Sequence, residues 1–226
     1  MGSSDLFVML LADSRLPVGG FTQSGQLEPA MASGLTSADV PAFCRARLRT
    51  VTLVEAATAV VTAAGAAPGA VEAEWAARTP SDAMRATSRT LARGLLRLAV
   101  RVWPEAGLPT LLRGVRPDAP PAGQLATSRA VVLGAIAAHV GIDPVRLARL
   151  IAYDDVQTVV AAALKLAPLD PADATGWVVE LMPDMDELAD QVAGLTDPRT
   201  MPAPSAPQLE LWAQQHALTT RRLFSA

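Results

Sequence analysis

Apolar residues recur at the spacing of an amphipathic helix along most of the chain, and no stretch alternates apolar and polar residues as a strand would. Thr36-Ser37-Ala38-Asp39 has the pattern of a capping box and predicts a long helix that ends near Ala64. Thr79-Pro80-Ser81-Asp82 predicts another helix, capped by Thr79, that runs to Trp103. The pattern therefore predicts an all-α fold.

Further helices are predicted on both sides of these two. Their expected ranges are about 5–11, 72–78 and 128–140, then 143–168, a segment that is cut at Pro183, and a short last helix. The stretch from Pro104 to Gly123 is rich in proline and glycine and predicts a long loop. Together these elements predict a compact bundle of about eight to ten helices in a single domain, residues 1–226.

Asp154-Asp155 interrupts the apolar pattern of the helix that begins at Asp143-Pro144. Paired aspartates can bind a divalent ion, so a metal-dependent helical enzyme of the isoprenoid type is one alternative. It would need a second acidic cluster that faces the first, and only the turn from Asp184 to Glu187 is available. A polar kink or a solvent-facing turn is the other account of the pair.

The composition fits a helical protein with a sizeable core. Half of the 226 residues are hydrophobic, 4% are aromatic, and the mean hydropathy is +0.27. The net charge of −3 argues against general nucleic-acid binding. Residues 56–71 form an uncharged run that is too short to span a membrane, and the N-terminus lacks the features of a signal peptide, so we expect a cytoplasmic location. We also expect a flexible proline-rich segment at about 196–207 and a C-terminal tail at 219–226.

The residues that usually carry catalysis or bind metals are few and scattered. The chain has two histidines, His139 and His216, and one cysteine, Cys44, none of them in a nucleophile or metal-ligand motif. A nickel or zinc site needs three or four well-placed ligands. We therefore expect neither a catalytic site nor a stably bound metal or cofactor.

The most distinctive stretch is ADSRLPVGGFTQSGQLE, residues 12–28. Leu16-Pro17 favours extended backbone, and Gly19-Gly20 permits positive φ and close backbone approach. Phe21 follows as a large apolar anchor, and Ser24 is expected to cap the next helix. The stretch is either a tight connection between helices or a partner-docking loop. A phosphate-binding loop is not expected, because the sequence motifs of such loops are absent.

A second distinctive feature is a ridge of arginines at every fourth position of the helix that begins near Thr79. Its members are Arg85, Arg89, Arg93, Arg97 and Arg101. Like charges at this spacing repel each other. The ridge is either a solvated face or, as we expect, a row whose Arg85, Arg89 and Arg93 meet carboxylates on a partner or on the acidic turn of this chain.

The string at residues 12–28 resembles the N-terminal signature of the UreF family of urease accessory proteins, with its Leu-Ala-Asp-Ser, Leu-Pro-Val-Gly-Gly-Phe and Ser-Gly…Leu-Glu elements. RATSRTLARGLLRL (85–98) is similar to the family's Arg-x-x-Ser…Gly-x-x-Leu-Leu helix. KLAPLD (165–170) and the final RLFSA resemble two later elements, so the resemblance spans nearly the full chain. The chain departs from the family pattern at Gln23, Ser128, Asp170 and Pro171.

The resemblance implies an all-helical, non-enzymatic maturation factor. Proteins of this family dimerise and bind the accessory protein UreD, also called UreH, and the pair recruits the GTPase UreG. The assembly inserts nickel into apo-urease, and UreF is expected to gate GTP hydrolysis by UreG. Nickel is then cargo in transit through the complex and is not stably bound.

The resemblance also implies which residues bind partners. They are Asp13, Ser14, Pro17, Gly19, Gly20, Phe21, Ser24 and Glu28 near the start, Arg85, Ser88, Arg89 and Gly94 in the arginine helix, Lys165, and Arg222, Leu223 and Phe224 at the end. We expect the tail to dock on UreD and to add little to this chain's own fold. The alternative is that Phe224 packs on the core of its own chain.

Overall fold

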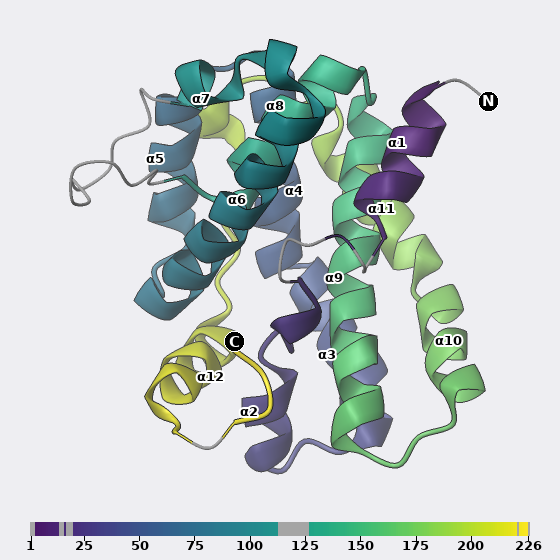
Figure 1. The fold of residues 1–226 in the computed structure, drawn as a ribbon. Helices are drawn as coiled ribbons and strands as arrows, with labels where there is room; N and C mark the ends of the chain where they lie inside the picture. Colours follow the sequence, from purple (N-terminus) through teal and green to yellow (C-terminus); the bar gives the residue numbers. More distant parts are fainter. Residues whose placement is uncertain (1–2, 14–15, 17–19, 113–126, 221, 226) are drawn as a thin grey trace.

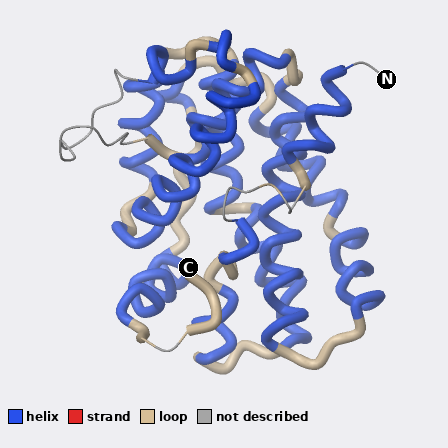
Figure 2. The backbone as a smooth tube through the Cα atoms, viewed as in Figure 1, coloured by secondary structure: helices blue, strands red, loops and turns tan. Residues whose placement is uncertain are grey.

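A computed structural model describes residues 3–13, 16, 20–112, 127–220 and 222–225 of the chain. Every regular element in this described part is helical, as Figures 1 and 2 show, and ten of its α-helices have nine residues or more. The predicted all-α bundle is therefore confirmed.

The α-helices of the described residues are numbered in chain order. They are α1 (Ser3–Leu11), α2 (Leu27–Ala32), α3 (Val40–Leu48), α4 (Val51–Ala63), α5 (Pro68–Arg78), α6 (Asp82–Val102), α7 (Leu108–Leu111), α8 (Arg129–Val140), α9 (Pro144–Leu166), α10 (Pro171–Glu180), α11 (Met182–Val192) and α12 (Pro207–Leu218). Single 3-10 turns lie at Gly20–Thr22, Ser37–Asp39, Pro104–Ala106 and Pro198–Thr200.

Helix α4 lies at the centre of the bundle, with α8 and α9 packed against it (Figure 1). Residues 56–62 are all buried, which is the pattern of a helix surrounded by others. The contact with α8 is close because Gly134 has no side chain. A Cβ at Gly134 would lie 2.4 Å from the Ala59 carbonyl oxygen.

The helix predicted to run from the capping box to Ala64 is in fact two helices. The capping box itself forms, because the Asp39 carboxylate accepts hydrogen bonds from both the backbone N–H and the hydroxyl of Thr36, at 2.9 and 2.6 Å. Helix α3 then ends, and Thr50 adopts φ −129° and ψ −95° before α4 begins. The Thr50 hydroxyl donates to the Ala46 carbonyl at 2.6 Å. No glycine or proline marks this break, so the sequence pattern could not show it.

Other helix boundaries differ less. Helix α6 is capped by Ser81, whose hydroxyl accepts from Met84 N, and not by Thr79 as predicted. The predicted loop after Pro104 begins with a 3-10 turn and the short helix α7, and residues 113–126 lie outside the described part. The predicted starts at Ser128 and Asp143 are confirmed, since both side chains accept a hydrogen bond from the third residue after them.

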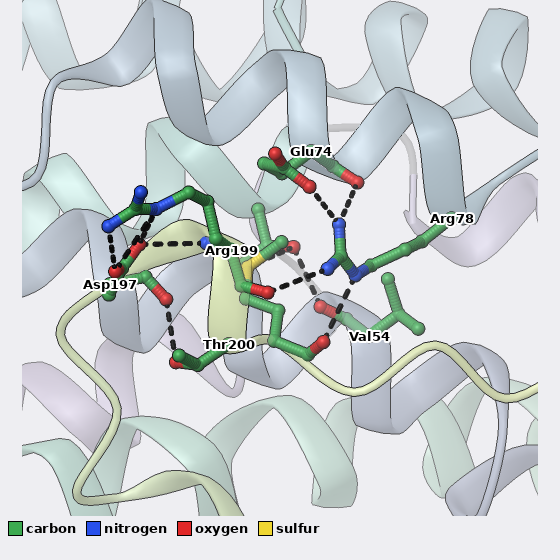
Figure 3. A network of polar contacts seen from close by, with 8 residues as sticks. Val54, Glu74, Arg78, Asp197, Arg199 and Thr200 are labelled. Carbon is green, nitrogen blue, oxygen red and sulfur yellow. Dashed lines mark hydrogen bonds and ion pairs between the residues drawn. The ribbon is translucent and has the colours of Figure 1, made fainter.

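The proline-rich segment is anchored in its middle to helix α5. Arg78 donates to the carbonyl oxygens of Met201 and Arg199, at 3.1 and 3.3 Å, and pairs with Glu74 on its own helix (Figure 3). Met201 is buried. The Asp197 carboxylate accepts from Arg199 N at 2.9 Å, which caps the 3-10 turn. Residues 199 and 201 thus have defined contacts with α5, while the flexibility expected at 196–207 stays a prediction.

Candidate functional site

The N-terminal signature and the C-terminal tail meet on one surface. The Ser225 backbone N–H donates to the Thr22 carbonyl at 2.7 Å, so a hydrogen bond connects the tail with the signature. Lys165, at the end of α9, lies between them. Its Nζ is 3.4 Å from the Phe21 carbonyl oxygen and 5.1 Å from the centre of the Phe224 ring. In Figure 1 the described tail segment, residues 222–225, lies beside α12 and α2.

We call Phe21, Lys165, Leu223 and Phe224 the composite surface, because segments far apart in the sequence build it. Phe21 and Leu223 are each 62% exposed, whereas Phe224 is 4% exposed. Exposed side chains of this size at one place favour protein contacts. The arrangement can therefore offer a partner two apolar side chains and a cation.

A groove of about 360 Å³ opens beside the composite surface. Its lining includes Asp13 and Leu16 from the signature, Tyr153 and Gln157 from α9, and Phe224 from the tail. The signature thus lies along α9, where its polar and apolar residues face a common space.

Glu28 is the residue that holds the tail in place. Its Oε1 accepts from Leu223 N at 2.6 Å, and its Oε2 accepts from Phe224 N at 3.0 Å. His216 Nε2 of α12 also hydrogen-bonds Oε2 at 3.0 Å. Burial raises the pKa of Glu28, but these hydrogen bonds outweigh it and hold the pKa below its usual range. Glu28 is therefore positioned as an ionised acceptor turned toward its own chain.

Beneath the signature, a buried ion pair fixes the turn that leads into α2. Arg47 of α3 donates two hydrogen bonds to Asp155 of α9, at 2.9 and 2.6 Å, and Thr52 adds a third at 2.7 Å. The remaining guanidinium nitrogen donates to the Gly25 carbonyl and to the Gln26 side chain, at 2.8 and 2.5 Å. Gln26 has a positive φ of 66°, so this turn needs such outside support.

A second cavity, of about 130 Å³, lies next to this ion pair. Arg129 of α8 pairs with Asp154 across it at 2.8 Å. Glu55 of α4 lines the cavity and accepts a hydrogen bond from Trp75 Nε1 at 2.7 Å. Burial raises the pKa of Glu55 to about 7, although the Trp75 bond and the charge of Arg129 oppose the shift.

These contacts correct the account of Asp154-Asp155. Helix α9 continues without interruption through both residues, so they do not form a solvent-facing turn. Each aspartate pairs with a different arginine. The acidic turn of α11 is engaged elsewhere, because Asp184 contacts Arg45 and Asp186 contacts Arg149. A two-cluster metal enzyme is therefore not favoured.

Residues of the arginine helix α6 form more hydrogen bonds and ion pairs within this chain than we predicted from the sequence. Arg85 pairs with Asp82 and donates to the Thr79 carbonyl at 2.6 Å. Ser88 is buried and accepts from Arg129 N at 3.0 Å. The ridge does not contact the acidic turn of α11, whose carboxylates face the arginines of α3 and α9.

Two further residues of this helix differ in burial, since Arg89 is half-buried and Gly94 is buried. Arg89 has a buried Nε without a hydrogen-bond partner, and its charge lowers the pKa of the buried Glu72, which burial raises. Gly94 is buried within α6, whose inner face packs on α8. A partner-contact role for Ser88 and Gly94 would therefore be indirect.

Some predicted site residues have other positions or lie outside the description. Ser14, Pro17 and Gly19 belong to the part that the structure does not describe, and Gly20 begins the 3-10 turn. Ser24 is not the cap of α2. Gln26 holds that position, while the Ser24 hydroxyl accepts from Glu28 N at 3.4 Å. Arg222 donates to the His216 carbonyl at 3.1 Å.

The tail contributes more to the fold than we expected. Phe224 belongs to the main hydrophobic core, and two backbone N–H groups of the tail are bound by Glu28. The alternative, in which Phe224 packs on its own chain, therefore describes the structure. The physical reason is that the preceding helix α12 packs on α2 and brings the tail back to the signature.

The sequence reasoning missed Arg47, Glu55 and the role of His216. Each is a polar helix residue whose partner lies 20 to 188 positions away. A charged residue on the apolar face of a predicted helix was the only available signal. The described part holds no group of three or more metal-ligating side chains placed to bind an ion. None of its helices is both long and apolar enough to cross a membrane.

Comparison with a family model and comparison with individual known proteins agree with each other. Residues 35–182 match the family model described as UreF. The chain is 36% identical over 222 residues to the urease accessory protein UreF of Mycobacterium sp. strain JLS, with 97% of each chain covered. It is 37% identical over 221 residues to the proteins of the same name from Mycobacterium bovis BCG Pasteur and Mycobacterium tuberculosis H37Ra, with 96% of each chain covered.

Proposed function

The chain belongs to the UreF family of urease accessory proteins, and from this premise we propose that it is a non-enzymatic maturation factor that works by binding partners. It forms a complex with UreD and the GTPase UreG, and this complex delivers nickel to apo-urease in the cytoplasm. In the complex it gates GTP hydrolysis by UreG and acts as a homodimer. Nickel is cargo, and the chain itself holds no resident metal.

The composite surface is the observation that carries the proposal. Phe21 and Leu223 each leave a large apolar side chain 62% exposed among the described residues, and Lys165 Nζ lies 3.4 Å from the Phe21 carbonyl oxygen. Apolar side chains around a cation suit a protein surface that has an apolar patch and a carboxylate. These residues also belong to the segments that resemble the family signature, so the surface fits a partner contact.

A co-expression pull-down tests the proposal. The tagged chain is expressed with UreD and UreG of its own urease cluster, and retention of both is measured together with the nickel content of urease in cells that lack the native accessory chain. We expect the parent chain to retain UreD and UreG and to restore nickel loading. A double variant, Phe21→Ala with Leu223→Ala, should retain little UreD and UreG and restore little nickel loading. It should still melt near the temperature of the parent chain.

Val179→Ala supplies the matched control, since Val179 is 57% exposed on α10, away from the composite surface. This variant should behave like the parent chain. Equal loss in the control and the double variant would place the contact elsewhere. A parent chain that retains neither UreD nor UreG would reject the proposed function.

A further inference from the structure

Glu28 is arranged to hold the C-terminal tail, not to meet a partner. Both of its carboxylate oxygens are used within the chain, by Leu223 N, Phe224 N and His216 Nε2. Its side chain is 16% exposed, and that of His216 is 4% exposed. Glu28 accepts two of the four hydrogen bonds that attach residues 222–225 in the described part of the chain, and hydrogen bonds to an ionised carboxylate are stronger than neutral ones.

The attachment determines where two members of the composite surface lie. Residues 222–225 run from the end of α12 back to the signature, and Ser225 N reaches the Thr22 carbonyl. When Glu28 binds the tail amides, Phe224 is buried beneath Lys165 and Leu223 faces outward. Without these bonds, the polar restraints that remain on residues 222–225 within the described part are the Ser225 contact and the Arg222 bond to His216.

We propose that Glu28 is a positioning residue, a latch that builds the composite surface by fixing the tail against the signature. This inference rests on the proposed function. It specifies that the partner recognises the latched tail as part of a folded surface and does not capture the tail as a free peptide. Glu28 acts through Leu223 and Phe224 and not through its own contact with the partner.

Glu28→Gln is the first test, because it keeps the shape of the side chain and removes the charge. Hydrogen exchange of the Leu223 and Phe224 amides and trypsin cleavage after Arg222 report the state of the tail. Binding to immobilised UreD reports the surface. We expect faster exchange and cleavage, a fall in melting temperature no larger than the roughly 4–8 °C that removal of the whole tail should cause, and UreD binding weakened on the order of tenfold, as loss of charge-assisted hydrogen bonds predicts.

A second pair of variants attacks the latch from the tail and leaves Glu28 intact. Leu223→Pro removes the N–H that Glu28 binds at 2.6 Å, whereas Leu223→Ala removes the same exposed side chain and keeps the N–H. Leu223→Pro should reproduce the open tail of Glu28→Gln and bind UreD more weakly than Leu223→Ala. Leu223→Ala should keep the tail amides protected.

Two results would overturn the proposal. Unchanged tail protection in Glu28→Gln and in Leu223→Pro would show that Glu28 is no latch. An open tail with unchanged or tighter UreD binding would show that the partner takes the tail as a free segment. Failure of the parent chain to bind UreD would instead reject the proposed function, while the exchange rates would still decide whether Glu28 holds the tail.

Discussion

Glu55 is an acid held in a half-buried polar cavity where ionisation is costly. Trp75 donates a hydrogen bond to it and Arg129 attracts its negative charge, while Glu72 and Asp155 repel that charge. Burial is the largest effect and raises the pKa of Glu55 from 4.5 to about 7. The folded chain therefore binds this proton more tightly than the unfolded chain. The stability that it contributes is present below pH 4.5 and is lost as the pH rises through 7.

Glu55→Gln should remove this dependence on pH. The amide oxygen can still accept from Trp75 Nε1, and it has no charge to bury. Relative to the parent, the variant should gain about 2–3 kcal/mol in the free energy of unfolding between pH 5 and pH 8. Urea titrations of both chains at the two pH values measure this difference. An identical change with pH in parent and variant would mean that Glu55 ionises as freely as in the unfolded chain.

The partners of the buried polar residues are the part of the site that the sequence predicts least. Asp155 interrupts an apolar pattern, and that pattern by itself favours a kink or an exposed turn. Its partners are Arg47 and Thr52, more than a hundred positions earlier in the chain. Local periodicity contains no information on such a pair, because the partners become neighbours only when α3, α4 and α9 pack together.

At the scale of elements, the contact between α4 and α8 depends on one missing side chain. A Cβ at Gly134 would lie 2.4 Å from the Ala59 carbonyl oxygen and 2.7 Å from Thr62 Cβ. Gly134→Ala should therefore force the two helices apart and cost about 1–3 kcal/mol, the usual effect of overpacking. Thermal or urea unfolding measures this cost.

Gly176→Ala is the control for the helix propensity of alanine. Gly176 lies in α10, and a Cβ there would meet nothing within 4 Å. Alanine favours the helix by roughly 0.5–1 kcal/mol over glycine, so this variant should be neutral or stabilised. If Gly134→Ala were as stable as Gly176→Ala, the close contact of α4 with α8 would not be a constraint on the fold.

Helix existence was predictable from the sequence, whereas some helix breaks were not. Caps at Ser128 and Asp143 use side chains next to the helix in sequence, so the pattern identifies them directly. The break at Thr50 lacks glycine and proline, and its geometry follows from the packing of α3 and α4 on the rest of the bundle. Propensity is a weak guide wherever tertiary packing sets the backbone.

For the whole molecule, the sequence predicted which segments matter but not that they meet. The signature, Lys165 and the tail were each identified separately, by resemblance. These segments come together because α12 packs against α2, and the sequence pattern does not indicate that contact. The same packing explains why the tail was expected to be peripheral, although Phe224 is part of the core.

A chain that ends at Thr220 tests the tail at this largest scale. Truncation removes the buried Phe224 ring and leaves the Glu28 carboxylate without its two tail donors. Burial of one phenylalanine side chain contributes about 2 kcal/mol. For a chain of this length, that loss corresponds to a fall of roughly 4–8 °C in melting temperature.

The point variant Leu223→Ala separates this effect from the loss of an exposed side chain. Leu223 is 62% exposed, so its truncation to alanine should leave the melting temperature within about 1 °C of the parent. If a chain ending at Thr220 melted at the same temperature as the parent, the prediction of a tail that adds little to the fold would be correct. In that case the hydrogen bonds to Glu28 and the packing of Phe224 would add nothing to the stability of the folded chain, and the tail would act only in binding.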